Sequence, residues 1–155
     1  MIVSFTGHRK ISNPSYVKEE LRKVLTELKP EKAISGMAIG VDTIAAELCI
    51  ELGIPFIAAV PFKGQESIWP TESKKKYNEL LSKASEVVIV SEGGYSAYKM
   101  QTRNIWMTDR CDKLIGVWDG SSGGTANCIF YAKSIGKEVI IINPKNYIIS
   151  TPGLN

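Results

Sequence analysis

The chain has little histidine and little cysteine, and each shortage removes a class of site. His8 is the single histidine among 155 residues, which excludes a metal site built on several histidines. The three cysteines, Cys49, Cys111 and Cys128, are odd in number and widely spaced, which fits neither a disulfide framework nor a zinc motif. We therefore expect free thiols in a reducing compartment, and neither a metal nor a cofactor.

Long apolar runs and a strong charge of one sign are also lacking. No run reaches the ~18 residues of a membrane span, and the amino terminus begins with strand-forming residues rather than a signal peptide. The net charge of +3 tolerates an anionic ligand but is mild for a nucleic-acid-binding surface. We expect a soluble, cytoplasmic protein without membrane contact. It should form one domain over residues 1–145, followed by an irregular tail over 146–155.

Segments with strand and helix periodicity alternate along the whole chain. Strands are predicted over 2–5, 33–35, 56–60, 87–90, 114–117 and 139–142, and helices over 15–28, 41–52, 71–83, 98–110 and 126–134. This alternation predicts a Rossmann-like, doubly wound α/β fold, with a mostly parallel sheet and helices on both faces. The β-branched run at 87–90 predicts a strand that is covered on two sides.

A short polar segment containing glycine follows each of five predicted strands. The segments are 6–9, 35–42, 61–65, 91–94 and 118–125. Because parallel strands end at the same edge of a sheet, we expect all five segments at its carboxyl edge. Open α/β sheets bind ligands at that edge, most often ligands that carry phosphate. The sequence therefore predicts a nucleotide-type site.

Two of these segments have the composition of a phosphate-binding loop. Gly36 and Gly40 precede a predicted helix, whose unpaired N–H groups and positive dipole end favour an anion. The same residues are equally typical of an ordinary turn in which Asp42 caps the helix. The segment 123–125 also precedes a helix, and the Thr125 hydroxyl can donate a hydrogen bond to a phosphate.

The predicted helix 98–110 carries an arginine inside an apolar stripe. Met100, Arg103 and Met107 share one helix face, and no acidic residue lies three or four positions from the arginine. Either the guanidinium extends to solvent, or it meets a partner from elsewhere in the fold or a ligand phosphate. Asn104 is placed to bind a base or sugar edge. Asp119 is placed to accept from a ribose, or simply closes an Asp-Gly turn.

Taken in order, these motifs resemble the SMF/DprA–LOG (SLOG) superfamily, and within it the small YpsA-like and phage-type members. Residues 35–42 and the Gly-Ile-Pro at 53–55 resemble a segment of the DNA-processing (DprA) proteins, as does the stretch from Gly64 to Trp69-Pro70. Residues 6–9 resemble the opening of the YpsA-like group. The likeness spans nearly the whole chain.

Two further motifs resemble the cytokinin-activating phosphoribohydrolases (LOG). They are Met100 to Asn104 and the Gly-Gly-Thr at 123–125. The chain departs from those enzymes where they carry a catalytic glutamate, since Cys128 stands there, and Asn104 replaces their lysine. The resemblance therefore implies phosphate and ribose binding more than LOG catalysis.

The binding residues predicted in this way come from three of the polar segments and from the helix 98–110. They are Gly7, His8, Arg9, Ser35, Gly36, Gly40, Asp42, Arg103, Asn104, Gly123, Gly124 and Thr125. The resemblance also implies a homodimer or higher oligomer that pairs through helices beside the site. Tyr98 and Trp106 are aromatic residues of the type enriched at such interfaces.

Three functions stay open. The first is binding or sensing of a nucleoside phosphate or ADP-ribose-like molecule, by a protein of phage or mobile-element origin. The second is a hydrolase that cleaves a nucleotide's N-glycosidic bond, with Arg103 and Asp119 as catalytic residues and Asp42 and Glu92 as further carboxylate candidates. The third is a single-stranded-DNA-binding module. The mild charge weighs against it, because such grooves combine basic tracks with stacking platforms.

Overall fold

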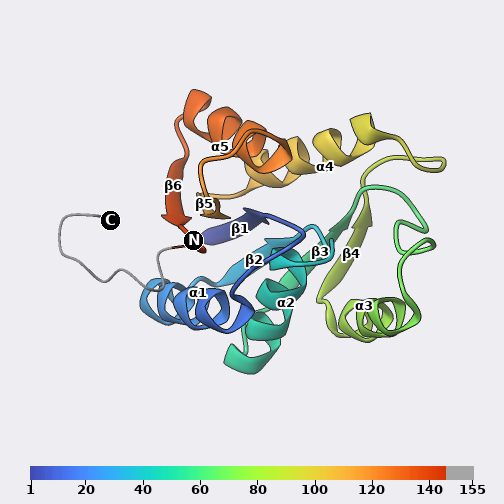
Figure 1. Cartoon of the computed structure of the whole chain (residues 1–155), viewed down its shortest axis with the longest axis horizontal. Helices are drawn as coiled ribbons and strands as arrows, with labels where there is room; N and C mark the ends of the chain where they lie inside the picture. The colour runs from blue at the N-terminus through green and yellow to red at the C-terminus, as the bar shows by residue number, and fades with distance from the viewer. Residues whose placement is uncertain (146–155) are drawn as a thin grey trace.

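The computed structural model describes residues 1–145 and shows strict alternation of strands and helices (Figure 1). The strands are β1 (Ile2–Gly7), β2 (Lys32–Ser35), β3 (Phe56–Val60), β4 (Glu86–Ile89), β5 (Lys113–Val117) and β6 (Glu138–Ile142). The helices are α1 (Pro14–Leu28), α2 (Val41–Leu52), α3 (Thr71–Lys83), α4 (Ala97–Arg110) and α5 (Gly124–Ser134). Each predicted element is present, with boundaries displaced by at most two residues. The predicted tail 146–155 lies outside the described residues.

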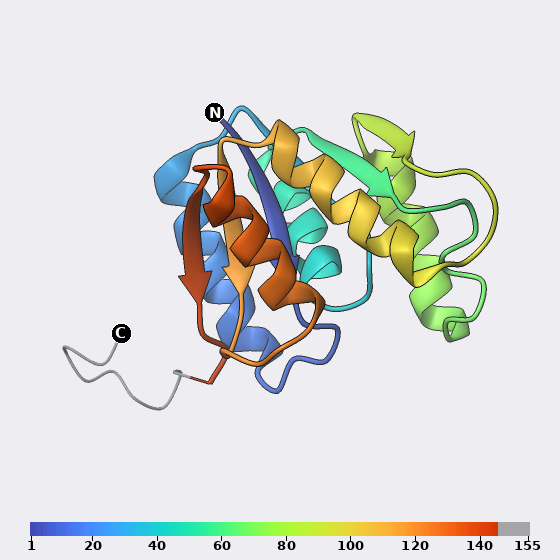
Figure 2. The ribbon, with the colours of Figure 1, turned by 90° about the horizontal axis from the view of Figure 1, so that it is seen from above.

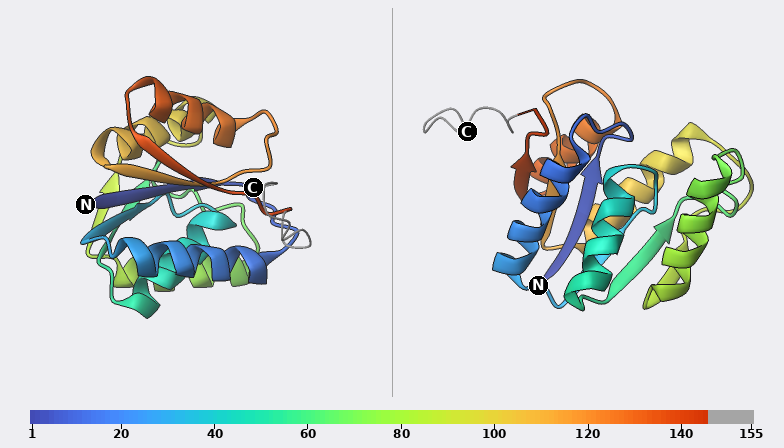
Figure 3. Two further views of the ribbon diagram at one scale, coloured as in Figure 1. Left: turned by 90° about the vertical axis from the view of Figure 1, so that its left-hand side faces the viewer. Right: turned by 60° about the horizontal axis from the view of Figure 1, so that its bottom comes forward.

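The six strands form one sheet in the order β4-β3-β2-β1-β5-β6, and every neighbouring pair is parallel. Helices α1, α2 and α3 cover one face, and α4 and α5 cover the other (Figures 1 and 3). This arrangement confirms the predicted doubly wound α/β fold. The strand order reverses between β1 and β5, and open α/β sheets bind ligands at such a switch point.

The core lies mainly between the sheet and the helices α1 and α2. Val17, Leu21 and Leu25 of α1 are buried, and Ala45, Ala46 and Cys49 form a stripe of small buried side chains on α2. Small side chains let α2 approach the sheet closely. All three cysteines are free and buried, so they pack as small apolar side chains. No helix within residues 1–145 has the length and apolar character needed to cross a bilayer.

The prediction for the fourth strand was wrong in one respect. β4 is an edge strand, and Val87 and Ile89 are 44% and 49% exposed rather than covered on both sides. Helix α4, on the face opposite α3, packs mainly over β1 and β3. An alternation of β-branched residues does not reveal whether a strand lies at the centre or the edge of a sheet. Only the order of the strands decides this.

Candidate functional site

A cleft of about 390 Å³ opens at the carboxyl edge of the sheet, beside the switch point between β1 and β5. Four of the five polar segments contribute to its lining, and α4 closes one side. The predicted residues that line it are Gly7, His8, Arg9, Asp42, Arg103, Asn104, Gly124 and Thr125. Ser35, Gly36, Gly40, Gly123 and Asp119 lie next to it without lining it. The fold therefore brings together groups that are more than 100 residues apart in the sequence.

The Arg103 guanidinium lies inside the protein, and the side chain is only 5% exposed. Its Nη1 donates to the carbonyl oxygens of Gly36 at 2.5 Å and Ala59 at 3.4 Å, and its Nε donates to Asn104 Oδ1 at 2.9 Å. Burial lowers the pKa of Arg103, and the nearby Asp42 carboxylate opposes this effect. The partners therefore come from elsewhere in the fold, and the guanidinium does not extend to solvent.

Asp42 supplies the buried negative charge that faces this arginine. Its Oδ2 accepts a hydrogen bond from the Ala38 N–H at 3.3 Å, and it lies in the first turn of α2. Burial raises the pKa of Asp42, while Arg103 acts in the opposite direction. Asp42 forms no cap hydrogen bond with α2, contrary to the alternative in which it caps the helix, but a carboxylate in this first turn repels an anion that approaches the helix end. The amino end of α2 is therefore a poor phosphate site.

The glycines of the segment 35–42 leave room for protein atoms. A Cβ at Gly36 would lie 2.8 Å from the Arg103 guanidinium and 2.8 Å from the Asp42 carboxylate. Gly40 has a φ of +96°, and a Cβ there would lie 2.5 Å from the His8 carbonyl oxygen. The buried Met37 adopts a φ of +60°, and its N–H donates to Ser35 Oγ at 3.2 Å. This loop is a compact support beneath the cleft.

The segment 123–125 differs, because its glycines face open space. Apart from the adjacent residues and the backbone of α5 itself, no atom of the described residues lies within 4 Å of a Cβ placed on Gly123 or Gly124. No side chain caps α5 within this part of the chain, and the first turn of the helix contains no acidic residue. Gly124 and Thr125 line the cleft. The first N–H groups of α5 and the Thr125 hydroxyl are therefore available to a ligand.

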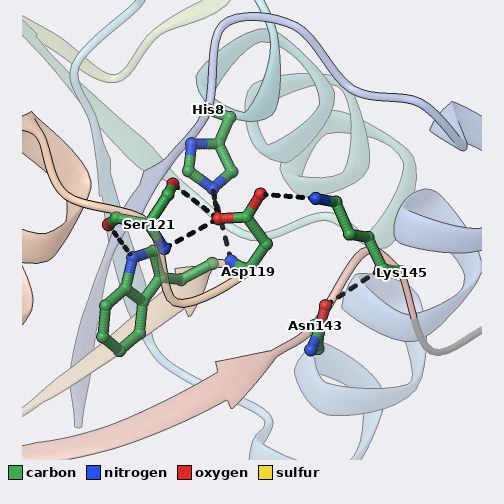
Figure 4. A network of polar contacts seen from close by, with 6 residues as sticks. His8, Asp119, Ser121, Asn143 and Lys145 are labelled. Atoms are coloured by element: carbon green, nitrogen blue, oxygen red, sulfur yellow. Dashed lines mark hydrogen bonds and ion pairs between the residues drawn. The ribbon is translucent and has the colours of Figure 1, made fainter.

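A polar cluster ties the loop after β5 to the loop after β1 (Figure 4). His8 Nε2 lies 3.2 Å from Asp119 Oδ1 and accepts the Asp119 N–H at 3.3 Å. Ser121 donates to Asp119 Oδ1 through its Oγ at 2.6 Å and its N–H at 3.0 Å, and Lys145 Nζ lies 3.3 Å from Oδ2. The bonds from Ser121 are the main reason why the pKa of Asp119 is held far below its ordinary value. Asp119 therefore holds the two loops together.

Several cleft residues come from connections that have no periodic pattern, and they were not among the predicted binding residues. Phe62 and Tyr95 meet edge to face, with ring centroids 5.9 Å apart. Gln65 Nε2 donates to the carbonyl oxygens of Gly36 and Met37, at 3.4 Å each, and its buried Oε1 accepts no hydrogen bond within residues 1–145. The one available signal was the polar segment 61–65 itself.

The parallel sheet and the cleft at its switch point define a Rossmann-like α/β domain with a candidate ligand site. The family model described as the YspA SLOG family matches residues 8–140, and the chain belongs to this family. The resemblance to the SLOG superfamily is thereby confirmed.

One relative and two solved structures show how far the likeness extends. The chain is 33% identical to the uncharacterized SPbeta prophage-derived protein YoqJ of Bacillus subtilis, over 86% of this chain and 92% of that protein. DNA processing protein A of Streptococcus pneumoniae matches 91% of the chain with a TM-score of 0.73 and 22% identity, and that of Helicobacter pylori matches 92% with a TM-score of 0.67 and 23% identity. The chain spans 50% and 65% of those two proteins, so the likeness shows a shared fold.

Proposed function

We propose that the cleft binds a nucleotide whose phosphate lies on the amino end of α5. The observation that carries this proposal is the open helix end at Gly124, which meets the same cleft as Arg9 and Arg103. Unpaired N–H groups and a positive dipole end attract a phosphate. A volume of about 390 Å³ lies within the usual range of ligand pockets.

The rest of the nucleotide has suitable partners in the same cleft. The Asp42 carboxylate lines the cleft and is an acceptor for a ribose hydroxyl. The Phe62 and Tyr95 rings offer apolar faces for the base. This assignment separates the negative phosphate from the negative Asp42, which a phosphate on the amino end of α2 would not do.

The proposal is tested by calorimetric titration with adenosine and guanosine mono- and diphosphates. Thr125→Val removes the hydroxyl at nearly constant volume, and we expect affinity to fall by about 10–150-fold, the scale of one hydrogen bond to a charged group. Thr102→Val is the matched control, because Thr102 lies on α4 outside the cleft. Absence of binding to the whole panel would overturn the proposal.

A second candidate function is hydrolysis of the nucleotide's N-glycosidic bond, and the position of Asp42 favours it. An oxocarbenium-like transition state needs a carboxylate near the anomeric carbon. Asp42 lines the cleft, whereas Asp119 is engaged in the loop cluster and the exposed Glu92 lies outside the lining. Chromatography of the nucleotide panel after incubation detects release of the base. Hydrolysis that persists in Asp42→Asn would exclude this role.

Binding of single-stranded DNA is the third candidate, because the H. pylori relative in fold is described as binding single-stranded DNA. The net charge of +3 supports it only weakly. Titration of an oligonucleotide at increasing salt tests it, since phosphate contacts make affinity fall steeply with salt concentration.

We also propose that the protein is a homodimer located in the cytoplasm. We propose a prophage-type origin as well, since the related YoqJ is described as prophage-derived. Tyr98 is 75% exposed and suits an interface, whereas Trp106 is half-buried beneath the Arg110 guanidinium, 4.1 Å from the ring centroid. Tyr98 is therefore the better anchor of the two predicted aromatics. Sedimentation equilibrium of the wild type and Tyr98→Ser tests this. A wild-type monomer at high micromolar concentration would contradict the dimer.

A further inference from the structure

A second pocket of about 240 Å³ lies between α4 and α5, which run side by side (Figure 2). From α4 it takes Ala97, Met100, Gln101, Asn104 and Ile105, and from α5 it takes Gly124, Asn127, Cys128 and Tyr131. These positions repeat at three- and four-residue intervals, so each helix contributes one continuous face. The pocket is therefore a groove between two regular helices.

The pocket continues directly from the cleft. Ala97, Met100, Asn104 and Gly124 line both spaces. A phosphate held by the first N–H groups of α5 therefore lies at the junction of the two spaces. Any group attached to the far side of that phosphate can enter the second pocket, between α4 and α5.

The chemistry of the second pocket differs from that of the cleft. The cleft has the charged residues Arg9, Asp42 and Arg103 in its lining, whereas none of the nine residues that line the second pocket is charged at neutral pH. Burial raises the pKa of the Cys128 thiol, which keeps it neutral. A site of this kind fits an uncharged ring with polar edges, because charged groups would lose solvation without gaining a partner.

Asn104 gives the junction a defined polarity. Its Oδ1 accepts the hydrogen bond from Arg103 Nε at 2.9 Å, which fixes the orientation of the amide. The NH₂ group has no hydrogen-bond acceptor within residues 1–145, so it can donate to a ligand. Asn127 and Gln101 are exposed amides on the rim of the same pocket, one from each helix. These three amides can form hydrogen bonds with hydroxyl groups or with the edges of a base.

We infer that the ligand is a nucleoside diphosphate with a second uncharged group, a sugar or a base, on its far phosphate, and that this group occupies the pocket between α4 and α5. The inference rests on the proposed nucleotide site. The bridging phosphates lie over Gly124, with the first nucleoside in the cleft.

Calorimetric titration with AMP, ADP, ADP-ribose and diadenosine diphosphate tests this assignment. We expect the wild type to bind at least one of the two extended ligands about tenfold more tightly than ADP, because the added ring is buried. ADP-ribose and diadenosine diphosphate distinguish a sugar from a base as the second group. Asn127→Trp fills the pocket from an exposed position that the cleft does not use. It should abolish the tenfold gain and leave the affinity for AMP within twofold.

Ser134→Trp is the matched control, since it places the same ring on an exposed position in the last turn of α5, away from both spaces. It should keep the full gain. The inference is overturned if neither extended ligand binds more tightly than ADP, or if Asn127→Trp retains the gain. In both cases binding of AMP would leave the proposed function intact. If AMP and ADP do not bind at all, the proposed function itself fails.

Discussion

The two glycine-rich loops of this protein look alike in the sequence and differ in the structure. At Gly36 and Gly40, an added Cβ would collide with protein atoms at 2.5 to 2.8 Å. At Gly123 and Gly124, it would meet nothing within 4 Å among the described residues. The first pair of glycines admits neighbouring protein groups, and the second pair faces open space, where the proposed phosphate would lie. A glycine motif alone does not separate these two uses.

The charges at the two helix ends reinforce this difference. The first turn of α2 contains the buried Asp42, whereas that of α5 contains no acidic residue. A helix end that already has a carboxylate has little remaining attraction for an anion. The loop before α2 therefore acts as a support, and the loop before α5 is the candidate phosphate site.

The largest expected effect is a difference between the two loops in how far a glycine-to-alanine substitution lowers the free energy of unfolding. Gly40→Ala should lower the free energy of unfolding by ~3 kcal/mol, because it combines a left-handed φ with a clash against the His8 carbonyl oxygen. Gly124→Ala should be neutral or stabilise by up to ~1 kcal/mol, since it only restricts the unfolded chain. Urea unfolding of both variants checks this. Equal losses would show that the two loops do not differ as described.

A double-mutant cycle tests what fills the space at Gly36. Gly36→Ala should cost ~2 kcal/mol, because the new methyl group meets the Arg103 guanidinium. Arg103→Ala should also destabilise the fold, by ~3 kcal/mol, since it leaves Asp42 buried without its counter-charge.

The combined variant should lose less stability than the sum of the two single losses, by ~1 kcal/mol, because the clash with the Arg103 guanidinium has gone and only the contact with the Asp42 carboxylate remains. Urea unfolding measures all four corners of the cycle. Strict additivity would mean that Arg103 is not what requires glycine at position 36.

A new carboxylate at the amino end of α5 should give this helix end the negative charge that Asp42 gives to the amino end of α2. Gly124→Asp should stabilise α5 by ~0.3–1 kcal/mol through the helix dipole, and it should weaken AMP binding by about tenfold through repulsion of the phosphate. Gly124→Asn keeps the shape without the charge and is the control. Thermal melting and calorimetric titration measure the two effects. If Gly124→Asp bound AMP with unchanged affinity, the phosphate would not lie at this loop.

The smallest expected effect concerns the cluster that holds the loop after β5. Hydrogen bonds from Ser121 keep the pKa of Asp119 below its ordinary value of 3.8, so this group stabilises the folded state above that pH. The contribution is lost as the pH falls below 3.8 through the folded-state pKa. Wild type should therefore lose more stability than Asp119→Asn between about pH 4 and pH 2. Parallel acid titrations by circular dichroism would contradict this if the two proteins lost stability equally.

The fold was predictable because its signals are local. The apolar spacing of Val17, Leu21 and Leu25 and the run at Phe56–Val60 identify their elements without any long-range information. The burial of β4 was not predictable in this way, since Val87 and Ile89 would form the same pattern in a central strand. The candidate site was predicted in part, through the motifs around Arg103 and Gly124. Tyr95 was not predicted because loops have no period, and Gln65 was placed at the edge of the sheet only as part of the segment 61–65.

The sequence by itself determined which elements form and which polar segments follow the strands, because periodicity and turn chemistry act over a few residues. The tertiary structure alone decided what each segment does. It placed the guanidinium of Arg103 against the carbonyl oxygen of Gly36, 67 residues away, and so made one glycine loop a support. It left the loop at Gly123 and Gly124 facing open space. Whether a glycine makes room for protein or for ligand depends on atoms distant in sequence, and only the packed chain brings them together.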